Sequence, residues 1–209
     1  MKNKYLIKNE QELESVIGAP MEFVKAKVLT QLDDLMKEFI RKSPLVFIST
    51  IDAQGHVDVS PKGDPSGFIH IDDSGNLQIP DRPGNRLTFG FRNILRNREI
   101  GLIFVVPNQL ETLRVKGIAT LHADPDVLAQ LSAGGKPALL CTHVEVKACF
   151  MHRGRAFVRS KLWPPPSWNT SMESIGAQQL APVLGGDANE GALQRTIDLL
   201  DRAYKAELY

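Results

Sequence analysis

The sequence predicts a mainly β protein, an antiparallel barrel or sandwich flanked by helices. From Ser43 onwards, short β-branched and aromatic segments follow one another, and turn signals such as Asp52–Gly55 separate them. Helical periodicity is confined to a few segments, so the regular alternation that marks a doubly wound α/β sheet is absent. A chain of 209 residues with 43% hydrophobic residues can bury a sizeable core as one domain with terminal additions.

Two helices are expected before the β region, in an N-terminal helical segment over 1–42. Asn9 is followed three residues later by Glu12, which is the pattern of a capped helix start, and this short helix ends before Gly18. A longer helix is expected over 22–42, because four apolar residues would share one of its faces: Val28, Leu32, Leu35 and Phe39.

The β region is expected to form one domain over 43–168. Its strands are predicted by alternating or β-branched runs that end at turn residues: Leu45–Ile51, Val57–Lys62, Phe68–Ile71, Leu77–Pro80, Ile100–Val106, Thr112–His122 and Leu139–Met151. In the last strand, the even-numbered residues from Leu140 to Phe150 are expected to share one face. Helices are expected over 86–97, with Asn85 as the cap, and from Asp124–Pro125.

A proline-rich connector and a helical extension follow the β region. Trp163–Trp168 contains consecutive prolines, which continue neither a helix nor a sheet. A last helix is expected after the cap at Asp187–Glu190, with apolar residues on one face: Leu193, Ile197, Leu200 and Tyr204. We expect the extension, 169–209, to pack on the barrel or on a dimer.

The charge balance and the apolar runs limit the classes of partner. With 25 basic and 24 acidic side chains, the net charge is +1, so no global field attracts nucleic acid or an anionic membrane. The first residues lack the apolar core of a signal peptide, and no apolar run approaches the length of a membrane span. Cys141 and Cys149 lie too far apart along one strand for a disulfide. We therefore expect a cytoplasmic protein that binds neither nucleic acid nor a membrane.

The sequence has no recognised hydrolytic or metal-binding motif. It lacks a G-x-S-x-G elbow, an H-E-x-x-H pair, a C-x-x-C pair and a G-x-x-x-x-G-K phosphate loop. The five histidines are scattered, with no pair at ligand spacing. We expect no metal site, and the sequence assigns no catalytic residue.

Polar and basic side chains alternate with apolar ones on two predicted strands. The first strand presents Asp58, Ser60 and Lys62 on one face, and the second presents Thr112, Arg114 and Lys116. We expect both stripes to contribute to the same kind of surface. The alternative is a solvated sheet face with lysines that protect an edge. On the second strand, Gly117 would permit close approach of a neighbouring backbone or of a ligand.

Two further segments concentrate positive charge. The loop that precedes the helix at 86–97 contains Asp81, Arg82, Asn85 and Arg86, and the two arginines beside a helix N-terminus suit an anion. An ordinary turn with surface arginines is the alternative. The segment after the long strand has no acidic residue, and its polar and aromatic candidates are Arg155, Arg159, Ser160, Lys161 and Trp163.

In this order along the chain, these segments resemble the pyridoxamine 5'-phosphate oxidase superfamily of FMN-binding split β-barrels. The resemblance covers about Ser43 to Trp168, and its most distinctive piece is Arg159-Ser-Lys-Leu-Trp163. It implies a split β-barrel that works as a homodimer, with FMN bound at the subunit interface and a small-molecule substrate.

The resemblance also implies roles for individual residues. Lys62 corresponds to the lysine that closes the family's Arg-x-Val-Leu-Leu-Lys strand, whose first arginine is Val57 here. Arg86 keeps the arginine of the family's phosphate group, and Arg82 would replace its lysine. Thr112 and Arg114 would face the flavin ring or its ribityl chain. The partner subunit would contribute Arg159, Ser160, Lys161 and Trp163.

The expected function is that of an FMN-dependent oxidoreductase, which passes hydride or electrons between a nicotinamide donor and a small acceptor. The Arg-x-His triplet of the vitamin B6 oxidases is missing, since Arg153-Gly-Arg155 stands in its place, so oxidation of pyridoxamine phosphate is not expected. The alternatives are an F420-dependent reductase, a flavin- or haem-binding carrier or sensor without turnover, and a barrel without a ligand.

Overall fold

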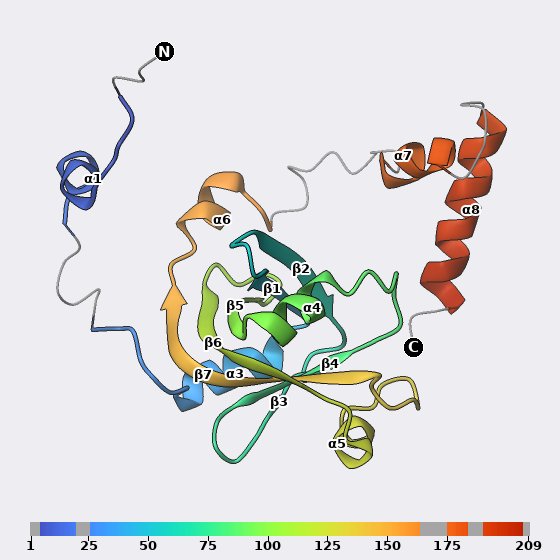
Figure 1. Cartoon of the computed structure of the whole chain (residues 1–209), viewed down its shortest axis with the longest axis horizontal. Helices are drawn as coiled ribbons and strands as arrows, with labels where there is room; N and C mark the ends of the chain where they lie inside the picture. Colours follow the sequence, from blue (N-terminus) through green and yellow to red (C-terminus); the bar gives the residue numbers. More distant parts are fainter. Residues whose placement is uncertain (1–4, 20–25, 164–174, 184–189, 207–209) are drawn as a thin grey trace.

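The computed structural model describes residues 5–19, 26–163, 175–183 and 190–206. One seven-stranded antiparallel sheet, in the order β2-β1-β5-β6-β7-β4-β3, curls into a half-barrel with helices beside it (Figure 1). The strands are β1 (Leu45–Ile51), β2 (Val57–Gly63), β3 (His70–Ile71), β4 (Leu77–Asp81), β5 (Glu99–Val105), β6 (Thr112–His122) and β7 (Leu140–His152). The predicted fold, an antiparallel split β-barrel with flanking helices, is confirmed.

Helices surround this sheet and follow it in the chain. They are α1 (Glu10–Ile17), α3 (Asp34–Lys42), α4 (Phe89–Arg96), α5 (Pro125–Gln130), α6 (Arg155–Ser160), α7 (Ile175–Val183) and α8 (Glu190–Ala206). The caps predicted for α1 and α5 are confirmed. Asn9 Oδ1 accepts a hydrogen bond from the Glu12 amide at 2.8 Å, and Asp124 caps α5 with Pro125 in its first turn. No helix among the described residues is long and apolar enough to cross a membrane.

The helix predicted over 22–42 is shorter than expected. It begins at Asp34, because the Asp33 side chain caps it by accepting from the Met36 amide at 2.8 Å. Before this cap, residues 26–32 form a turn, a bend and an isolated β-bridge, in which Leu29 pairs with Cys149 of β7. The predicted apolar face is therefore wrong for two reasons. Val28 and Leu32 lie before the helix, and Leu35, which lies in it, is 81% exposed. Residues 20–25 lie outside the described ranges.

The core lies between the inner face of the sheet and the helices α3 and α4. Met36 and Ile40 of α3 and Ile94 of α4 pack into one cluster with buried strand residues: Val46, Ile48, Leu77, Ile79, Leu102, Phe104, Leu113, Val115 and Val144. The alternation of buried and exposed residues along β1, β5 and β6 follows from the two-residue period of a strand with one covered face.

The longest pairing, β6 with β7, contains a β-bulge. The register shifts between Lys116 and Gly117, so that Lys116 pairs with Ala148 but Gly117 pairs with Val146. A Cβ on Gly117 would lie 2.5 Å from the Glu145 carbonyl oxygen, so only glycine allows this approach. The prediction that Gly117 permits close approach of a backbone is confirmed.

The bulge overturns the alternation predicted for the last strand. Val144 and Cys149 are both buried, although an odd number of positions separates them. Beyond the bulge, Phe150 therefore lies on the outer face of the sheet, beside Arg114 of β6. Both cysteines are buried and free, as the spacing predicts.

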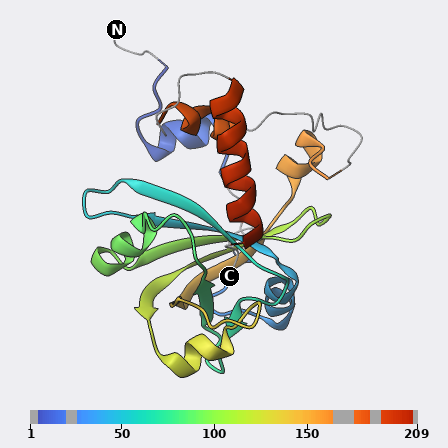
Figure 2. The same ribbon diagram turned by 90° about the vertical axis from the view of Figure 1, so that its right-hand side faces the viewer.

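The described helices of the C-terminal extension pack against each other (Figure 2). Ala177 and Ala181 of α7 and Ala192 and Thr196 of α8 are buried, and small residues allow two helices to approach closely. The predicted last helix is confirmed as α8, but most of its predicted cap at Asp187–Glu190 lies outside the described residues. Helix α7 was not expected.

Replacement of Gly117 tests the bulge. We expect Gly117→Ala to lower the free energy of unfolding by about 1–3 kcal/mol, the usual cost of overpacking, because its Cβ meets the backbone of β7. Gly101→Ala is the control, since a Cβ there would lie 3.8 Å from Ser49 Cβ, which is ordinary contact. Urea unfolding measures both. Equal stabilities of the two variants would contradict the close approach.

Candidate functional site

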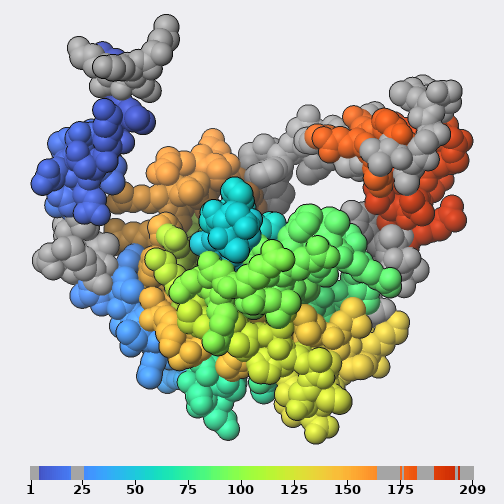
Figure 3. Space-filling view, viewed as in Figure 1, coloured from blue at the N-terminus to red at the C-terminus, as the bar shows by residue number. Residues whose placement is uncertain are grey.

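Lys62 of β2 lies at the point where β2, β4 and α4 meet. Its ammonium forms an ion pair with Asp81 of β4 and lies 4.9 Å from the centre of the Phe91 ring in α4. Asp58 is nearby, because a Cβ on Gly90 of α4 would lie 3.6 Å from its carboxylate. In Figure 3, α4 and the loop before it (green) lie beside the β1–β2 hairpin (cyan) on the surface. The β2 stripe is therefore next to the first turn of α4.

The start of α4 differs from the prediction. The helix begins at Phe89 after Thr88, whose side chain makes no capping hydrogen bond, whereas Asn85 accepts from the Leu87 amide at 3.1 Å. Arg86 and Thr88 have φ values of 59° and 56°, and left-handed residues cannot belong to a right-handed helix. The prediction that Asn85 caps this helix is therefore wrong.

This arrangement leaves positive charge uncompensated near the start of α4. Arg86 is exposed and makes no ion pair with any described residue. The first amide groups of α4 have no side-chain cap, and they carry the positive end of the helix dipole. This end of α4 is suited to an anion.

Arg82 has a different environment. Its Nε donates to Asp64 Oδ2 at 2.8 Å, and the Asp64 side chain is only 2% exposed. Arg82 also lines a cleft of about 560 Å³ with Ser66, His70 and the segment 130–134. The predicted role of Arg82 in an anion site beside Arg86 stays a prediction, and Asp64 already balances its charge.

The two polar stripes lie on opposite faces of the sheet. One row of paired residues is on the inner face: Ser60, Ile48, Leu102 and Val115. The neighbouring row is on the outer face: Pro61, Phe47, Ile103, Arg114 and Phe150. The two stripes, which were expected to contribute to the same kind of surface, therefore lie on different faces of the chain, because strand register fixes the face of each side chain. Of the second stripe, Thr112 is buried and Lys116 is exposed.

The outer face has an apolar part and a cationic part. Four apolar side chains of β1, β2 and β5 are exposed by 38–63%: Phe47, Ile103, Val59 and Val57. Next to them in the sheet, Arg114 of β6 lies against the Phe150 ring, with its guanidinium carbon 5.3 Å from the ring centre. Sequence reasoning missed Phe150, because it placed this residue on the same face of the strand as Val144.

The basic segment after β7 is held against the loop between β5 and β6. The Trp163 indole N–H donates to the Gln109 carbonyl at 2.6 Å, and the ring centres of Trp163 and Phe157 are 5.7 Å apart. A Cβ on Gly154 would lie 1.8 Å from the Leu110 carbonyl oxygen, so the segment touches this loop at both ends. The polar side chains predicted there are exposed: Arg155, Arg159, Ser160 and Lys161.

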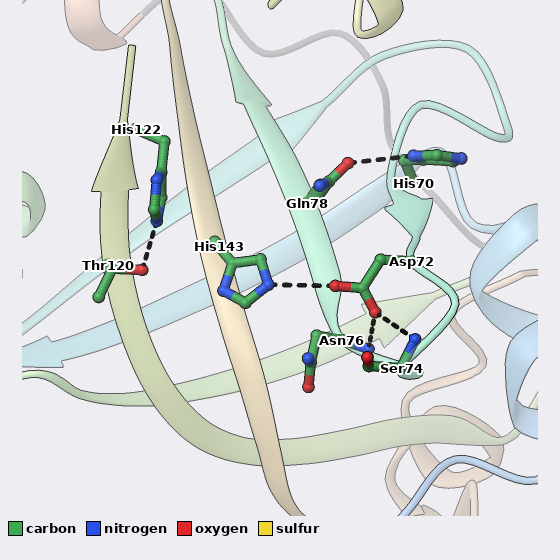
Figure 4. Close-up of polar contacts among 8 residues, drawn as sticks. All are labelled: His70, Asp72, Ser74, Asn76, Gln78, Thr120, His122 and His143. Carbon is green, nitrogen blue, oxygen red and sulfur yellow. Dashed lines mark hydrogen bonds and ion pairs between the residues drawn. The ribbon is translucent and has the colours of Figure 1, made fainter. Parts of the chain in front are cut away.

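A second polar cluster, which sequence reasoning also missed, lies around His143 (Figure 4). His143 Nε2 is 3.2 Å from Asp72 Oδ2, and the amides of Ser74 and Asn76 donate to the other carboxylate oxygen of Asp72. A cleft of about 650 Å³ adjoins this pair, and Arg98 also lines it. The two partners are far apart in the sequence, so no local pattern could have revealed them.

Hydrogen bonds stabilise the charged form of Asp72 in this cluster. Partial burial disfavours the charged form of Asp72. The hydrogen bonds from the Asn76 amide, His143 and the Ser74 amide outweigh it and hold the pKa of this carboxyl below its ordinary value. The pair therefore joins the β3–β4 turn to β7.

Metal and thiol chemistry find no support in the described ranges. No group of three or more His, Cys, Asp or Glu side chains there could hold a metal ion. Burial raises the pKa of the Cys141 thiol to about 11, which keeps it protonated at neutral pH.

Comparison with known families decides the assignment. The sequence profile described as pyridoxamine 5'-phosphate oxidase matches residues 32–148, more than half of the chain. The chain belongs to the pyridoxamine 5'-phosphate oxidase family. The match contains α3, the strands β1–β6, α4 and most of β7, and it ends before α6. The basic segment Arg155–Trp163 thus lies outside the matched residues.

Solved structures give weaker likenesses. HupZ of Group A Streptococcus is 21% identical, with 59% of this chain and 95% of that chain covered and a TM-score of 0.46. General Stress Protein 26 of Bacillus anthracis is 10% identical, with coverages of 55% and 88% and a TM-score of 0.43. HutZ, the heme storage protein of Vibrio cholerae, is 17% identical, with coverages of 59% and 97% and a TM-score of 0.41. No curated protein sequence gave a significant match. Membership of the family depends on the sequence match alone.

Proposed function

We propose that this chain binds FMN as a homodimer and is an oxidoreductase, which passes hydride or electrons between a nicotinamide donor and a small acceptor. Membership of the pyridoxamine 5'-phosphate oxidase family supports a flavin as the cofactor. The observation that carries the proposal is the uncapped start of α4, which follows the exposed Arg86 in the chain and whose Phe91 ring lies 4.9 Å from the Lys62 ammonium.

These groups fit the phosphate of FMN. A phosphate near −2 is stabilised by helix amides, by an arginine fork and by an ammonium group. Arg86 forms no ion pair with a described residue, whereas Lys62 would exchange its contact with Asp81 for one with the phosphate. Asp58 and Asp81 reduce the positive potential, so the affinity should depend strongly on Arg86.

When bound, FMN supplies the hydride and electron transfer itself. The contribution of the chain is to bind and orient. Arg86 and Lys62 would hold the phosphate, while Arg114 and Lys116 provide positive charge on the outer face of the sheet. Thr112, which lies on the same face but is buried, would supply a hydroxyl where the resemblance expects the ribityl chain or the flavin ring.

The homodimer would form through the outer face of β2, β1 and β5. Val57 and Val59 are 63% and 60% exposed there, beside Phe47 and Ile103, and monomers rarely expose a contiguous apolar surface of this kind. Because the two polar stripes lie on opposite faces, one flavin can contact both only across a subunit interface. The partner would add groups from its basic segment: Arg155, Arg159, Ser160, Lys161 and Trp163.

Flavin titration tests the phosphate site. We expect Arg86→Ala to weaken FMN binding by about 1.5–3 kcal/mol, the scale of a charged hydrogen bond, and Lys62→Ala to weaken it less, because Lys62 must give up its ion pair with Asp81 to bind the phosphate. Quenching of flavin fluorescence measures the affinity. The rate of NADH or NADPH oxidation by the FMN-loaded protein, compared with free FMN, measures turnover.

The matched control is Arg96→Ala, an exposed arginine at the opposite end of α4. It should bind FMN like the unaltered protein. An Arg86→Ala affinity equal to that of the control would refute the phosphate role. Full FMN binding without turnover above free FMN would replace the oxidoreductase by a carrier.

Sedimentation velocity tests the dimer. Val59→Lys places a charge on the apolar outer face, so we expect the dimer dissociation constant to rise at least about tenfold, the scale of a central interface residue. Leu95→Lys, at a site that is 74% exposed on α4, is the control and should remain dimeric. A Val59→Lys variant that dimerises like the control would rule out this interface.

A further inference from the structure

Three side chains that carry or can carry positive charge surround Phe150 on the outer face of β7. The Lys27 ammonium lies 5.1 Å from the centre of the Phe150 ring, and the Arg114 guanidinium carbon lies 5.3 Å from it. The His152 ring is 6.3 Å away, centre to centre. The three residues come from the segment before α3, from β6 and from β7, so the fold brings together groups that are distant in the sequence.

No acid among the described residues pairs with a member of this cluster. Two other strand lysines do have such partners: Lys62 pairs with Asp81, and Lys147 pairs with Glu145. Within the described residues, Lys27, Arg114 and His152 form no ion pair, and the Lys27 ammonium donates only to the Met151 carbonyl, at 3.2 Å. Like charges held close together repel unless an anion or solvent compensates them.

The surroundings of His152 disfavour its charged form. Burial, and then the positive charges of Arg114 and Lys27, hold the pKa of His152 below its ordinary value. The charged groups that act on this imidazole from the neighbouring elements are therefore both positive, Arg114 on β6 and Lys27 before α3. An anion placed among them would relieve the repulsion.

The backbone fixes the positions of these groups. Leu29 and Cys149 exchange two hydrogen bonds, Leu29 N to Cys149 O at 2.9 Å and Cys149 N to Leu29 O at 2.8 Å, and this pairing places Lys27 beside β7. The bulge at Gly117 turns Phe150 outward to meet Lys27 and Arg114. Lys27, Arg114 and Phe150 are half-buried, so they are restrained more than ordinary surface side chains.

We propose that Lys27, Arg114 and His152 form an oxyanion subsite on the outer face of the sheet, with the Phe150 ring as its floor, which binds a carboxylate or phosphate group of a small ligand. Arg114 is shared with the proposed flavin site, whereas Lys27 and His152 are not among the residues assigned to FMN, and the subsite lies on the face opposite to Lys62. All three side chains lie together in the chain without a ligand, so the subsite can be tested without FMN. In a flavoprotein, it selects acidic substrates over neutral ones.

The subsite predicts a coupling between anion binding and protonation. A bound anion raises the pKa of His152 above its value in the free protein, so binding takes up a proton. Affinity for a fully ionised anion should therefore rise as the pH falls through the pKa that His152 has in the complex, and it should level off below the lowered pKa of His152 in the free protein.

The test is titration of the flavin-free protein with sulfate, as the phosphate mimic, and with malonate, as the carboxylate probe. The resonances of the His152 ring report binding at this place, and calorimetry gives the affinity. We expect Lys27→Met and His152→Gln to weaken binding at about pH 6 by about 10- to 150-fold, the scale of one charged hydrogen bond. The preferred probe identifies the oxyanion.

The control is Lys147→Met, which removes the same charge from β7 at a lysine that is already paired with Glu145. It should bind like the unaltered protein. An equal loss in this control, His152 resonances that ignore both anions, or an affinity for sulfate that is independent of pH would each overturn the subsite. Because no flavin is present, failure of FMN binding would not affect the result.

Discussion

The close approach of β6 and β7 at Gly117 is the constraint on which the rest of the structure depends. The carbonyl of Glu145 occupies the space that any side chain at position 117 would need, and the register shifts by one residue at this point. The shift reverses the faces of β7, so Cys149 enters the core and Phe150 leaves it. Without this shift, the Phe150 ring would lie on the core face of the sheet, and Arg114 would have no aromatic ring beside it on the outer face.

Two regions with different chemistry result from this sheet. On the inner face of the edge strand β2, Lys62 lies at the first turn of α4, where Arg86 and the helix amides add positive potential. On the outer face, an apolar area on β1, β2 and β5 adjoins the cations around Phe150. A single flavin that touched both regions would have to lie between two chains. The proposed flavin site therefore requires the proposed dimer.

Local patterns predicted most of the sheet, because a strand with one covered face leaves a two-residue period in the sequence. Thr112–His122 was predicted with the bounds that the structure has, and the capping residues Asn9 and Asp124 were identified from their side-chain chemistry.

The errors have definite causes. Helix α3 begins after its cap at Asp33 and not at residue 22. Helix α4 begins later than predicted, because Arg86 and Thr88 have left-handed backbone conformations. A bulge inserts one residue without changing composition, so the outward position of Phe150 could not be read from β7 alone. Contacts between distant residues, such as His143 with Asp72, depend on the strand order.

The central claim is that this chain of the pyridoxamine 5'-phosphate oxidase family recognises a flavin through its phosphate. Parallel fluorescence titrations of the purified, flavin-free protein with FMN and with riboflavin test it most directly, because the two ligands differ only in the phosphate. The account predicts one FMN per chain and an affinity at least about tenfold higher than for riboflavin, since a charged hydrogen bond contributes on that scale. Equal affinities, or no binding of FMN, would contradict it.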